Sequence, residues 1–228
     1  MQTHFTTEAY FQDFASIRWW HRIRLSPEII TPGEVMHGPD DGDWPTTRFG
    51  LPNNLRGKSV LDIGCWDGFF SFEAEKRGAS RVVAIDVPRS SGGNWGGTAG
   101  FHFAKKALRS RVDFHEMSIY DAPILGRFDV VLCYGLLNHL TDVLGAIRSL
   151  ASVTAPGGVC LIESAIALGE ANYLEYRPGF NNDPTNYFYP TLNCLRAMCE
   201  ECGFSPPTVV CQTELRATIA ASMASSER

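Results

Sequence analysis

Short apolar runs alternate with segments of helical spacing between residues 58 and 164. Each run ends at a glycine or a polar residue and is too short for a buried helix, so it predicts a strand that is covered on both faces. We expect strands over residues 59–63, 81–86, 112–115, 128–133 and 159–163. We expect helices over residues 69–77, 101–108 and 142–153.

Two more strands are expected near the end of the chain, over residues 209–212 and 216–222, after a helix over residues 191–202. The tight connection between these two strands makes them antiparallel. Strands and helices that alternate along a chain form right-handed crossovers and a parallel sheet. The pattern therefore predicts an α/β protein with a doubly wound, Rossmann-like seven-stranded sheet, of which six strands are parallel and one is antiparallel.

Residues 1–56 show no strand periodicity and are rich in aromatic residues and turn formers. We expect a short helix near residues 7–17 and an extended, packed arm after it. A chain of 228 residues is long enough for one sizeable core and does not require a second. We therefore divide it into an N-terminal arm or lid, residues 1–56, and a ligand-binding domain, residues 57–228.

The composition narrows the class of partner. A net charge of −5 weighs against a broad nucleic-acid footprint, because phosphate binding needs clustered Lys and Arg. No apolar run reaches the roughly 20 residues that span a bilayer, and the first residues lack the pattern of a secretory signal. We expect a cytoplasmic protein with reduced cysteines and no membrane partner. Cys199 and Cys202 form one close pair without a second, so no metal site is predicted.

Ligands of doubly wound sheets bind at the carboxyl ends of the strands, where the strand order reverses. The first predicted strand ends at Gly64, which lets the backbone turn with no side chain between it and a ligand. Asp86 ends the second predicted strand, and its carboxylate can accept hydrogen bonds from both hydroxyls of a ribose. The neighbouring residues that we also expect to contact the ligand are Cys65, Trp66, Gly68 and Val87.

Two kinds of ligand fit a loop and a carboxylate of this kind. A pyridine dinucleotide needs three glycines, of which the later ones make room for its pyrophosphate. Trp66 occupies the position of the second glycine and would obstruct a pyrophosphate, whereas a nucleoside sulfonium carries no phosphate. Asp62, just before the loop, also favours a cationic ligand, because it would orient the loop and face an ammonium group. The residues therefore favour a sulfonium methyl donor over a dinucleotide.

The same segments resemble known motifs. Motif I of the class I S-adenosyl-L-methionine-dependent methyltransferases is similar to Val60-Leu61-Asp62-Ile63-Gly64-Cys65-x-x-Gly68, and their ribose-binding acidic residue is similar to Asp86. Later motifs of that class resemble Phe128-Asp129-Val130-Val131, Leu136-Leu137-Asn138-His139-Leu140 and Pro156-Gly157-Gly158. The resemblance covers residues 58–164. It implies a methyltransferase whose cofactor is S-adenosyl-L-methionine.

A narrower resemblance extends over most of the chain. The chain resembles the tRNA wobble-uridine carboxymethyltransferases and their smaller relatives in three segments. These are Trp19-Trp20-His21-Arg22-Ile23, the loop 64–70 and Asn186-Tyr187-Phe188-Tyr189-Pro190-Thr191. By position, this resemblance implies donor contacts at Gly64, Asp86, Ile119, Tyr120, Tyr134, Asn138 and Arg216. Asn138 stands where the tRNA enzymes have a tyrosine near the extra carboxylate of their donor, and this chain is shorter than theirs. We therefore expect ordinary S-adenosylmethionine as the donor, and we favour a small-molecule acceptor over tRNA.

The remaining donor contacts are expected beyond the third and fourth strands. Met117, Ser118 and Ile119 would flank the adenine. Tyr134 and Gly135 would lie beside the methionine part of the donor. The alternative is that these are core residues at the ends of strands.

Three residues are candidates for proton transfer or acceptor binding. A histidine ordinarily titrates near neutrality, so His139 is suited to take a proton from the acceptor, although a packing role fits it equally well. His21 lies in the aromatic arm, which would fold over the donor. Glu163 ends the fifth strand, where it would hydrogen-bond the acceptor or act as a base.

Aromatic residues would form the walls of the acceptor site. Trp20 belongs to the arm, Trp95 to a glycine-rich segment, and Tyr187 and Tyr189 to the long stretch of residues 164–190. Packing over the sheet is the alternative for the tyrosines, and an exposed linker is the alternative for Trp95.

The sequence therefore predicts methyl transfer to an oxygen or nitrogen atom of a small-molecule acceptor, for example in secondary metabolism. The alternative acceptor is a tRNA wobble uridine. A donor-binding protein without catalytic activity is a third hypothesis, and the intact Gly64, Gly68 and Asp86 argue against it.

Overall fold

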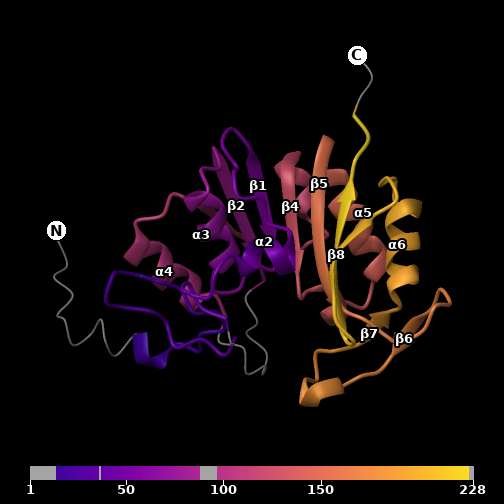
Figure 1. The fold of residues 1–228 in the computed structure, drawn as a ribbon, viewed down its shortest axis with the longest axis horizontal. Coiled ribbons are helices and arrows are strands. Elements are labelled where there is room, and N and C mark those ends of the chain that lie inside the picture. The colour runs from indigo at the N-terminus through magenta and orange to yellow at the C-terminus, as the bar shows by residue number, and fades with distance from the viewer. Residues whose placement is uncertain (1–13, 36, 88–96, 226–228) are drawn as a thin grey trace.

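The main sheet has seven strands in the order β3-β2-β1-β4-β5-β9-β8 (Figure 1). The structure is a computed structural model and describes residues 14–35, 37–87 and 97–225. β9 is antiparallel to both of its neighbours, and the other adjacent pairs are parallel, so the predicted fold class is confirmed. The strands are β1 (Ser59–Ile63), β2 (Arg81–Asp86), β3 (Asp113–Glu116), β4 (Phe128–Tyr134), β5 (Thr154–Ala165), β8 (Thr208–Gln212) and β9 (Arg216–Ser222).

Helices cover both faces of the sheet (Figure 1). Leu61 and Ile63 of β1 pack into the core on the side of α5 and α6, whereas Val60 packs into a second core on the side of α3 and α4. Burial on both faces explains why the strands appear in the sequence as continuous apolar runs. The helices are α2 (Trp44–Phe49), α3 (Phe69–Lys76), α4 (Ala99–Leu108), α5 (Val143–Val153) and α6 (Leu192–Glu201).

Side-chain caps fix the start of two of these helices. Asp142 accepts a hydrogen bond from the amide of Gly145 at 2.8 Å and caps α5. Thr191 accepts one from the amide of Cys194 at 3.1 Å and caps α6. Each cap satisfies an amide that would otherwise lack a partner in the first helical turn.

Several local features differ from the sequence-based expectations. The stretch of residues 164–190 contains a hairpin of β6 (Leu174–Tyr176) and β7 (Phe188–Pro190), which lies beyond the main sheet. α2 was not predicted, because its six residues are too few to show helical spacing. β5 begins before Pro156-Gly157-Gly158, where its register to β4 shifts, so the turn predicted there is an irregularity within a strand. The helix expected near residues 7–17 lies outside the described residues except for a helical turn at 14–16.

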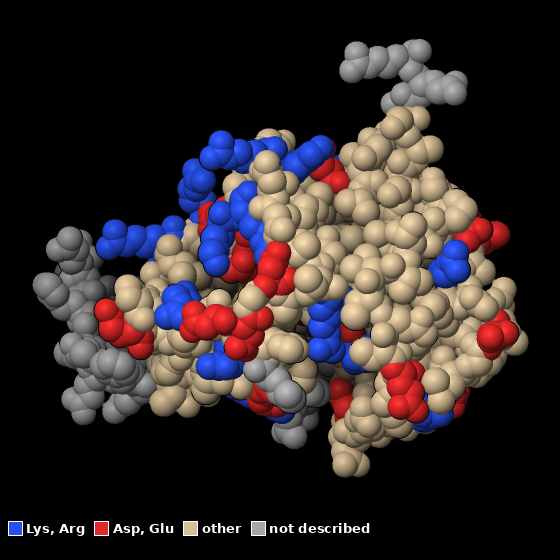
Figure 2. Space-filling view, in the orientation of Figure 1, with Lys and Arg blue, Asp and Glu red and all other residues tan. Residues whose placement is uncertain are grey.

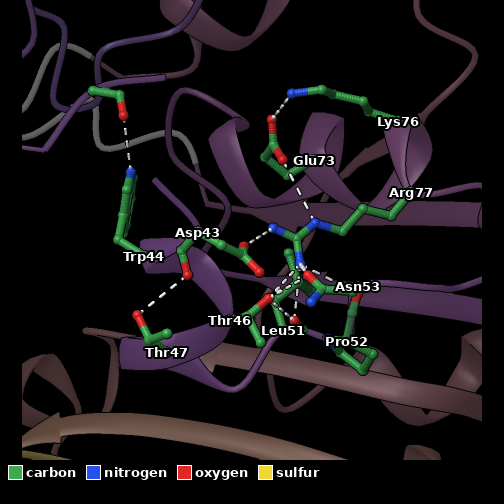
Figure 3. Close-up of polar contacts among 11 residues, drawn as sticks. Asp43, Trp44, Thr46, Thr47, Leu51, Pro52, Asn53, Glu73, Lys76 and Arg77 are labelled. Atoms are coloured by element: carbon green, nitrogen blue, oxygen red, sulfur yellow. Dashed lines mark hydrogen bonds and ion pairs between the residues drawn. The ribbon is translucent and has the colours of Figure 1, made fainter. Parts of the chain in front are cut away.

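Arg77 joins the N-terminal arm to α3 (Figure 3). Its guanidinium donates to the Thr46 hydroxyl at 2.7 Å, to the Leu51 carbonyl at 2.9 Å and to the Asp43 carboxylate at 2.9 Å. Glu73 lies 3.6 Å from its Nε. The side chain of Arg77 is only 11% exposed, so this cluster binds residues 43–51 of the arm firmly to the domain.

Apolar residues of the arm also enter the second core. Trp19, Ile23, Trp44 and Leu51 are buried together with the aromatic residues of α3. The arm and the β6–β7 hairpin lie on either side of the lower edge of the sheet, where the parallel strands end (Figure 1). The arm thus shares a core with the rest of the chain, and its boundary at residue 56 stays a prediction.

Candidate active site

A cleft opens at the carboxyl ends of β1, β2 and β4, where the strand order reverses. The empty space inside the cleft and its open mouth amounts to about 590 Å³. The predicted donor and catalytic residues in its wall are Gly64, Trp66, Asp86, Val87, Tyr134 and His139. Gly135, expected beside the donor, also lines it, and Gly97, Thr98 and Leu136 complete the wall without having been predicted.

The Asp86 carboxylate connects two backbone segments of the wall. Its Oδ2 accepts from the amide of Trp66 at 2.8 Å, and its Oδ1 accepts from the amide of Val87 at 2.7 Å. A carboxylate can accept about four hydrogen bonds, so these contacts are compatible with binding of ribose hydroxyls. Asp86 thereby fixes the loop and lines the cleft at the same time.

Three residues of the loop after β1, namely Gly64, Trp66 and Gly68, have left-handed backbone conformations. Gly64 has a φ of 75°, and a Cβ there would lie 3.3 Å from the Leu136 side chain on the facing wall. Trp66 has a φ of 49°, which is unusual for a bulky residue and is stabilised here by the hydrogen bond of its amide to Asp86. A glycine at residue 64 thus leaves the cleft open at its narrowest backbone approach.

Two predicted loop contacts lie behind the wall rather than in it. A Cβ on Gly68 would lie 2.6 Å from both Phe101 and Phe72, so this glycine allows close packing of α3 against α4. Cys65 is buried in the second core, and burial raises the pKa of its thiol well above the ordinary value. The donor contacts expected for these two residues stay predictions.

Asp62 lies beneath the loop. Its Oδ2 accepts from the hydroxyl of Ser71 in α3 at 2.6 Å, and the residue is 3% exposed. Burial raises the pKa of this carboxyl to about 7 despite that hydrogen bond, and the nearby charge of Asp86 adds to the rise. Asp62 is therefore placed to hold the loop against α3, and it does not line the described cleft.

Asp67 ties the arm to the same loop. It is fully buried and accepts hydrogen bonds from the amides of Trp20 and His21 at 3.0 and 2.7 Å. Its Oδ1 also lies 2.7 Å from Nδ1 of His21. The sequence analysis missed Asp67, because its partners come from a distant segment with no local pattern that indicates the contact.

The two arm residues predicted for the acceptor site pack against the back of the loop. The indole of Trp20 stacks on that of Trp66, with ring centroids 5.1 Å apart. His21 stacks on Phe69 at 5.1 Å and is not among the residues that line the described cleft. Trp20 thus contacts Trp66, which lines the cleft, and the roles predicted for Trp20 and His21 stay predictions.

His139 is the histidine in the cleft wall, at the end of the short 3₁₀ helix η2 (Leu137–His139). Its Nδ1 lies 2.9 Å from the Thr185 hydroxyl and 3.2 Å from the Thr185 carbonyl. Asn138 is buried beside it and donates to the Asn186 side chain at 2.7 Å, while its own carbonyl accepts from the amide of Tyr187. The segment after η3 (Phe180–Asn182) is thus fastened to η2.

Glu163 and Arg216 form a bidentate ion pair across the β5–β9 ladder. Both carboxylate oxygens accept from the guanidinium, from its Nε and at 2.8 Å from its Nη2. A Cβ on Gly135 would lie 3.6 Å from that Nη2, so the pair stands directly behind the cleft wall. The ion pair holds the guanidinium of Arg216 in place, and the role of base or acceptor contact expected for Glu163 stays a prediction.

The residues after β3 are spread over several environments. Ile119 is buried in the first core, and Met117 packs against that core while its amide donates to the Asp86 carbonyl. Tyr120 is 40% exposed and donates to the Asp142 carbonyl. The amide of Asp121 donates to the carbonyl of Ser118. None of these predicted donor contacts is among the residues that line the described cleft, so their role stays a prediction.

The predicted aromatic walls are distributed in a similar way. The phenol of Tyr134, which was expected beside the donor, donates to the Phe49 carbonyl at 2.9 Å, and its ring lies against that of Phe49 in α2. Tyr187 is half-buried, and Tyr189 is buried with a hydroxyl that has no hydrogen-bond partner among the described residues. Trp95 lies outside the described residues. Acceptor binding by Tyr187, Tyr189 and Trp95 stays a prediction, as does donor binding by Tyr134.

Basic side chains gather on the upper part of the molecule, over β1 and β2 (Figure 2). Lys58 precedes β1 and Arg81 begins β2, and both are exposed. This is the amino edge of the sheet, opposite the edge that holds the cleft. Among the described residues there is no group of three or more potential metal ligands and no helix long and apolar enough to cross a membrane.

Comparison with known proteins identifies relatives of the chain. A family model described as a methyltransferase domain matches residues 45–208. A tRNA U34 carboxymethyltransferase of Campylobacter hominis is 27% identical over 188 residues, which are 80% of this chain and 64% of that protein. A protein of the same name from Klebsiella pneumoniae is 29% identical over 174 residues, 74% of this chain and 50% of that protein. The chain spans about half to two thirds of the length of these curated relatives.

Solved structures share the fold. The N-terminal domain of EvdMO1, crystallised with S-adenosylhomocysteine (SAH) and D-fucose, superposes with a TM-score of 0.71 at 15% identity, over 98% of this chain and all of that one. A 1,6-didemethyltoxoflavin-N1-methyltransferase of Burkholderia thailandensis, also with S-adenosylhomocysteine, gives a TM-score of 0.56 at 18% identity, over 74% of this chain and 72% of that one.

The strand order and the solved structures that share it show the fold of the class I S-adenosyl-L-methionine-dependent methyltransferases. Since the methyltransferase-domain model covers most of the sequence, the chain belongs to that family. The predicted class and its cofactor are thereby confirmed.

Proposed function

We propose that the protein transfers the methyl group of S-adenosyl-L-methionine to an oxygen or nitrogen atom of a small-molecule acceptor. The observation that carries the proposal is the cleft at the β1–β4 crossover, with the open backbone of Gly64 on one side and the carboxylate of Asp86 on the other. When bound, the donor supplies an electrophilic methyl group on a sulfonium, which leaves as a neutral thioether.

The residues of the wall would divide the binding between them. Asp86 would accept hydrogen bonds from the ribose hydroxyls, and Gly64 would allow the backbone to approach the donor closely. Arg216, held by Glu163 behind Gly135, would lie near the methionine part of the donor. Asp62 would act indirectly by holding the loop to Ser71, so that the loop needs little rearrangement on binding.

His139 would act as the general base. It lies in the cleft wall, and its Nδ1 is engaged by Thr185. Methyl transfer by direct displacement requires alignment of the acceptor, the methyl group and the sulfur, and some acceptors also require removal of a proton. A base positioned by a second group is the usual arrangement for that step.

The charge distribution favours a small acceptor. The protein carries a net charge of −5, and exposed basic residues such as Lys58 and Arg81 lie at the edge opposite the cleft. The second candidate is modification of a tRNA wobble uridine, which the curated relatives favour by name. A gel shift with total tRNA separates the two, because tight, salt-sensitive binding would support the tRNA acceptor and would contradict the small one.

All seven cysteines are free thiols in the structure, and we propose the reducing cytoplasm as the location of the protein.

The direct test incubates the protein with methyl-labelled donor and a metabolite extract and identifies the labelled product by mass spectrometry. A labelled small molecule that does not form with the Asp86→Ala variant supports the proposal. If the label appears only in RNA, the result would support tRNA as the acceptor and contradict a small-molecule acceptor. Donor binding without labelled product in any extract would favour a non-catalytic donor-binding protein.

A further inference from the structure

A chain of hydrogen bonds links His139 in the cleft wall to the carboxylate of Asp183. The Thr185 hydroxyl lies 2.9 Å from Nδ1 of His139 and donates to Oδ1 of Asp183 at 2.6 Å. The second carboxylate oxygen of Asp183 lies 3.8 Å from the same Nδ1. Neither Asp183 nor Thr185 belongs to a pattern that the sequence analysis singled out.

The directions of these hydrogen bonds fix the protonation of the imidazole. The Thr185 hydroxyl has one proton, which it gives to Asp183, so toward His139 it can only accept. The Thr185 carbonyl, 3.2 Å from Nδ1, can also only accept. Both contacts therefore require the proton of the neutral ring to sit on Nδ1, which places the lone pair on Nε2.

The segment that carries the two residues is held rigidly. Oδ1 of Asp183 also accepts from the amide of Thr185 at 2.9 Å, which closes a tight turn around Pro184. The next residues bind η2 directly, through the hydrogen bond between Asn138 and Asn186 and that between the Asn138 carbonyl and the Tyr187 amide. The orientation of Thr185 toward His139 is therefore built into the contact between the two segments.

The pair is also shielded from water. The side chain of Asp183 is 9% exposed and that of His139 is 18% exposed. An imidazolium formed at this place would be stabilised by the nearby carboxylate more strongly than on an open surface, because the local dielectric constant is lower. The exposed pair of His115 and Asp113 on β3, with side chains 38% and 60% exposed, lacks that shielding.

We propose that Asp183 and Thr185 are positioning residues that hold His139 as a proton acceptor, and that the acceptor molecule presents a hydroxyl group. In the transfer step, the acceptor oxygen forms a bond to the methyl carbon, and the carbon–sulfur bond breaks with its electron pair going to sulfur. The hydroxyl proton moves to Nε2 of His139, and Asp183 stabilises the resulting imidazolium. This inference rests on the proposed function and narrows its acceptor to the hydroxyl class.

Nuclear magnetic resonance of the histidine side chains tests the positioning role without any acceptor. Long-range ¹H–¹⁵N spectra of the whole protein report which nitrogen carries the proton, and the His139→Gln variant identifies the signals of His139. We expect the Nδ1–H form in the wild type. Thr185→Val should lower the ratio of Nδ1–H to Nε2–H by roughly tenfold, the scale of one hydrogen bond, and Thr185→Ser should restore it. Asp183→Asn should lower it as well, and Asp113→Asn is the matched control that should leave it unchanged.

Calorimetry with S-adenosylhomocysteine on the same variants separates the two levels of the proposal. We expect the wild type, Thr185→Val and Asp183→Asn to bind S-adenosylhomocysteine equally well. A change in the tautomer ratio then concerns the acceptor step and not binding of the donor. An Nε2–H form in the wild type, or a ratio that neither variant changes, would overturn the positioning role while leaving the proposed function intact. Absence of binding to the wild type would overturn both.

The identity of the transferred methyl tests the acceptor class. With ¹³C-methyl donor and the metabolite extract, we expect a product whose carbon shift is that of an O-methyl group, and its formation should be at least tenfold slower in Thr185→Val with KM unchanged. A product with an N-methyl carbon, formed at the same rate by Thr185→Val, would contradict the inference.

Discussion

Oδ1 of Asp67 lies 2.7 Å from Nδ1 of His21, although the two residues are 46 positions apart in the sequence. Asp67 belongs to the loop that follows β1, and His21 belongs to the N-terminal arm. Because the same carboxylate also accepts from the amides of Trp20 and His21, it holds the arm directly against the loop that lines the cleft. The arm is therefore tied to the loop that forms part of the cleft wall.

We predict that Asp67→Ala destabilises the protein by about 2–4 kcal/mol, because two buried amides and an imidazole lose their acceptor. Urea unfolding followed by circular dichroism measures the change. Asp40→Ala is the control, since the side chain of Asp40 is 72% exposed and pairs with Arg24 on the surface, where the loss should stay below about 1 kcal/mol. Equal stability of the two variants would contradict the role given to Asp67.

Asp86→Ala should weaken binding of S-adenosylhomocysteine by about 1.5–3 kcal/mol, the scale for hydrogen bonds to a charged group. The substitution also removes the acceptor of the Trp66 amide, so the fold is checked by thermal melting. Asp113→Ala, at an exposed position of β3, is the control for loss of a negative charge. Unchanged affinity in a folded Asp86→Ala variant would remove Asp86 from the donor site.

Two glycines with left-handed backbone allow packing to be separated from backbone strain. Gly57 has a φ of 73°, and a Cβ added there would meet open space, so Gly57→Ala should cost only about 1–2 kcal/mol of stability. Gly68 has a φ of 84° and a Cβ there would lie 2.6 Å from Phe72 and Phe101, so Gly68→Ala should cost about 1–3 kcal/mol more. Urea titrations of the two variants measure these losses of stability. Equal losses would contradict the prediction, because they would show that α3 and α4 move apart without cost to make room for the Cβ at residue 68.

Asp62 predicts a pH dependence of stability. Burial raises the pKa of its carboxyl to about 7, from an ordinary value of 3.8, so the folded protein holds this proton more tightly than the unfolded chain does. The contribution of this proton to the stability of the fold is therefore fully present below about pH 4 and is lost as the pH rises through about 7. Asp62→Asn should gain stability relative to the wild type as the pH rises from 4 to 8, by at most about 4 kcal/mol. A constant difference between the two proteins over this range would contradict the raised pKa.

The sheet and the strand-end residues that line the cleft could be predicted from the sequence because they depend on local patterns. Buried strands are continuous apolar runs, and Gly64 and Asp86 stand at the ends of two of them. The β6–β7 hairpin could not be predicted, since β6 has three residues, of which two are exposed.

Contacts between distant segments were not predictable in the same way. Glu163 was expected to be a base, but its environment is set by Arg216, which is 53 positions away and reaches it only because β5 and β9 are paired. Thr185 lies 46 positions from His139, and the contact between them depends on how the segment after η3 packs on η2. Residue type and position made His139 a candidate, whereas its contact with Thr185 appears only in the folded chain.

The most direct test of the account is isothermal titration of the wild-type protein with S-adenosylhomocysteine and, separately, with NAD⁺. The cleft at the β1–β4 crossover predicts one site per chain for the adenosyl thioether and no heat of binding for the dinucleotide, since Trp66 in the cleft wall stands where a pyrophosphate-binding loop has its second glycine. Saturable binding of NAD⁺ with no binding of S-adenosylhomocysteine would contradict the account.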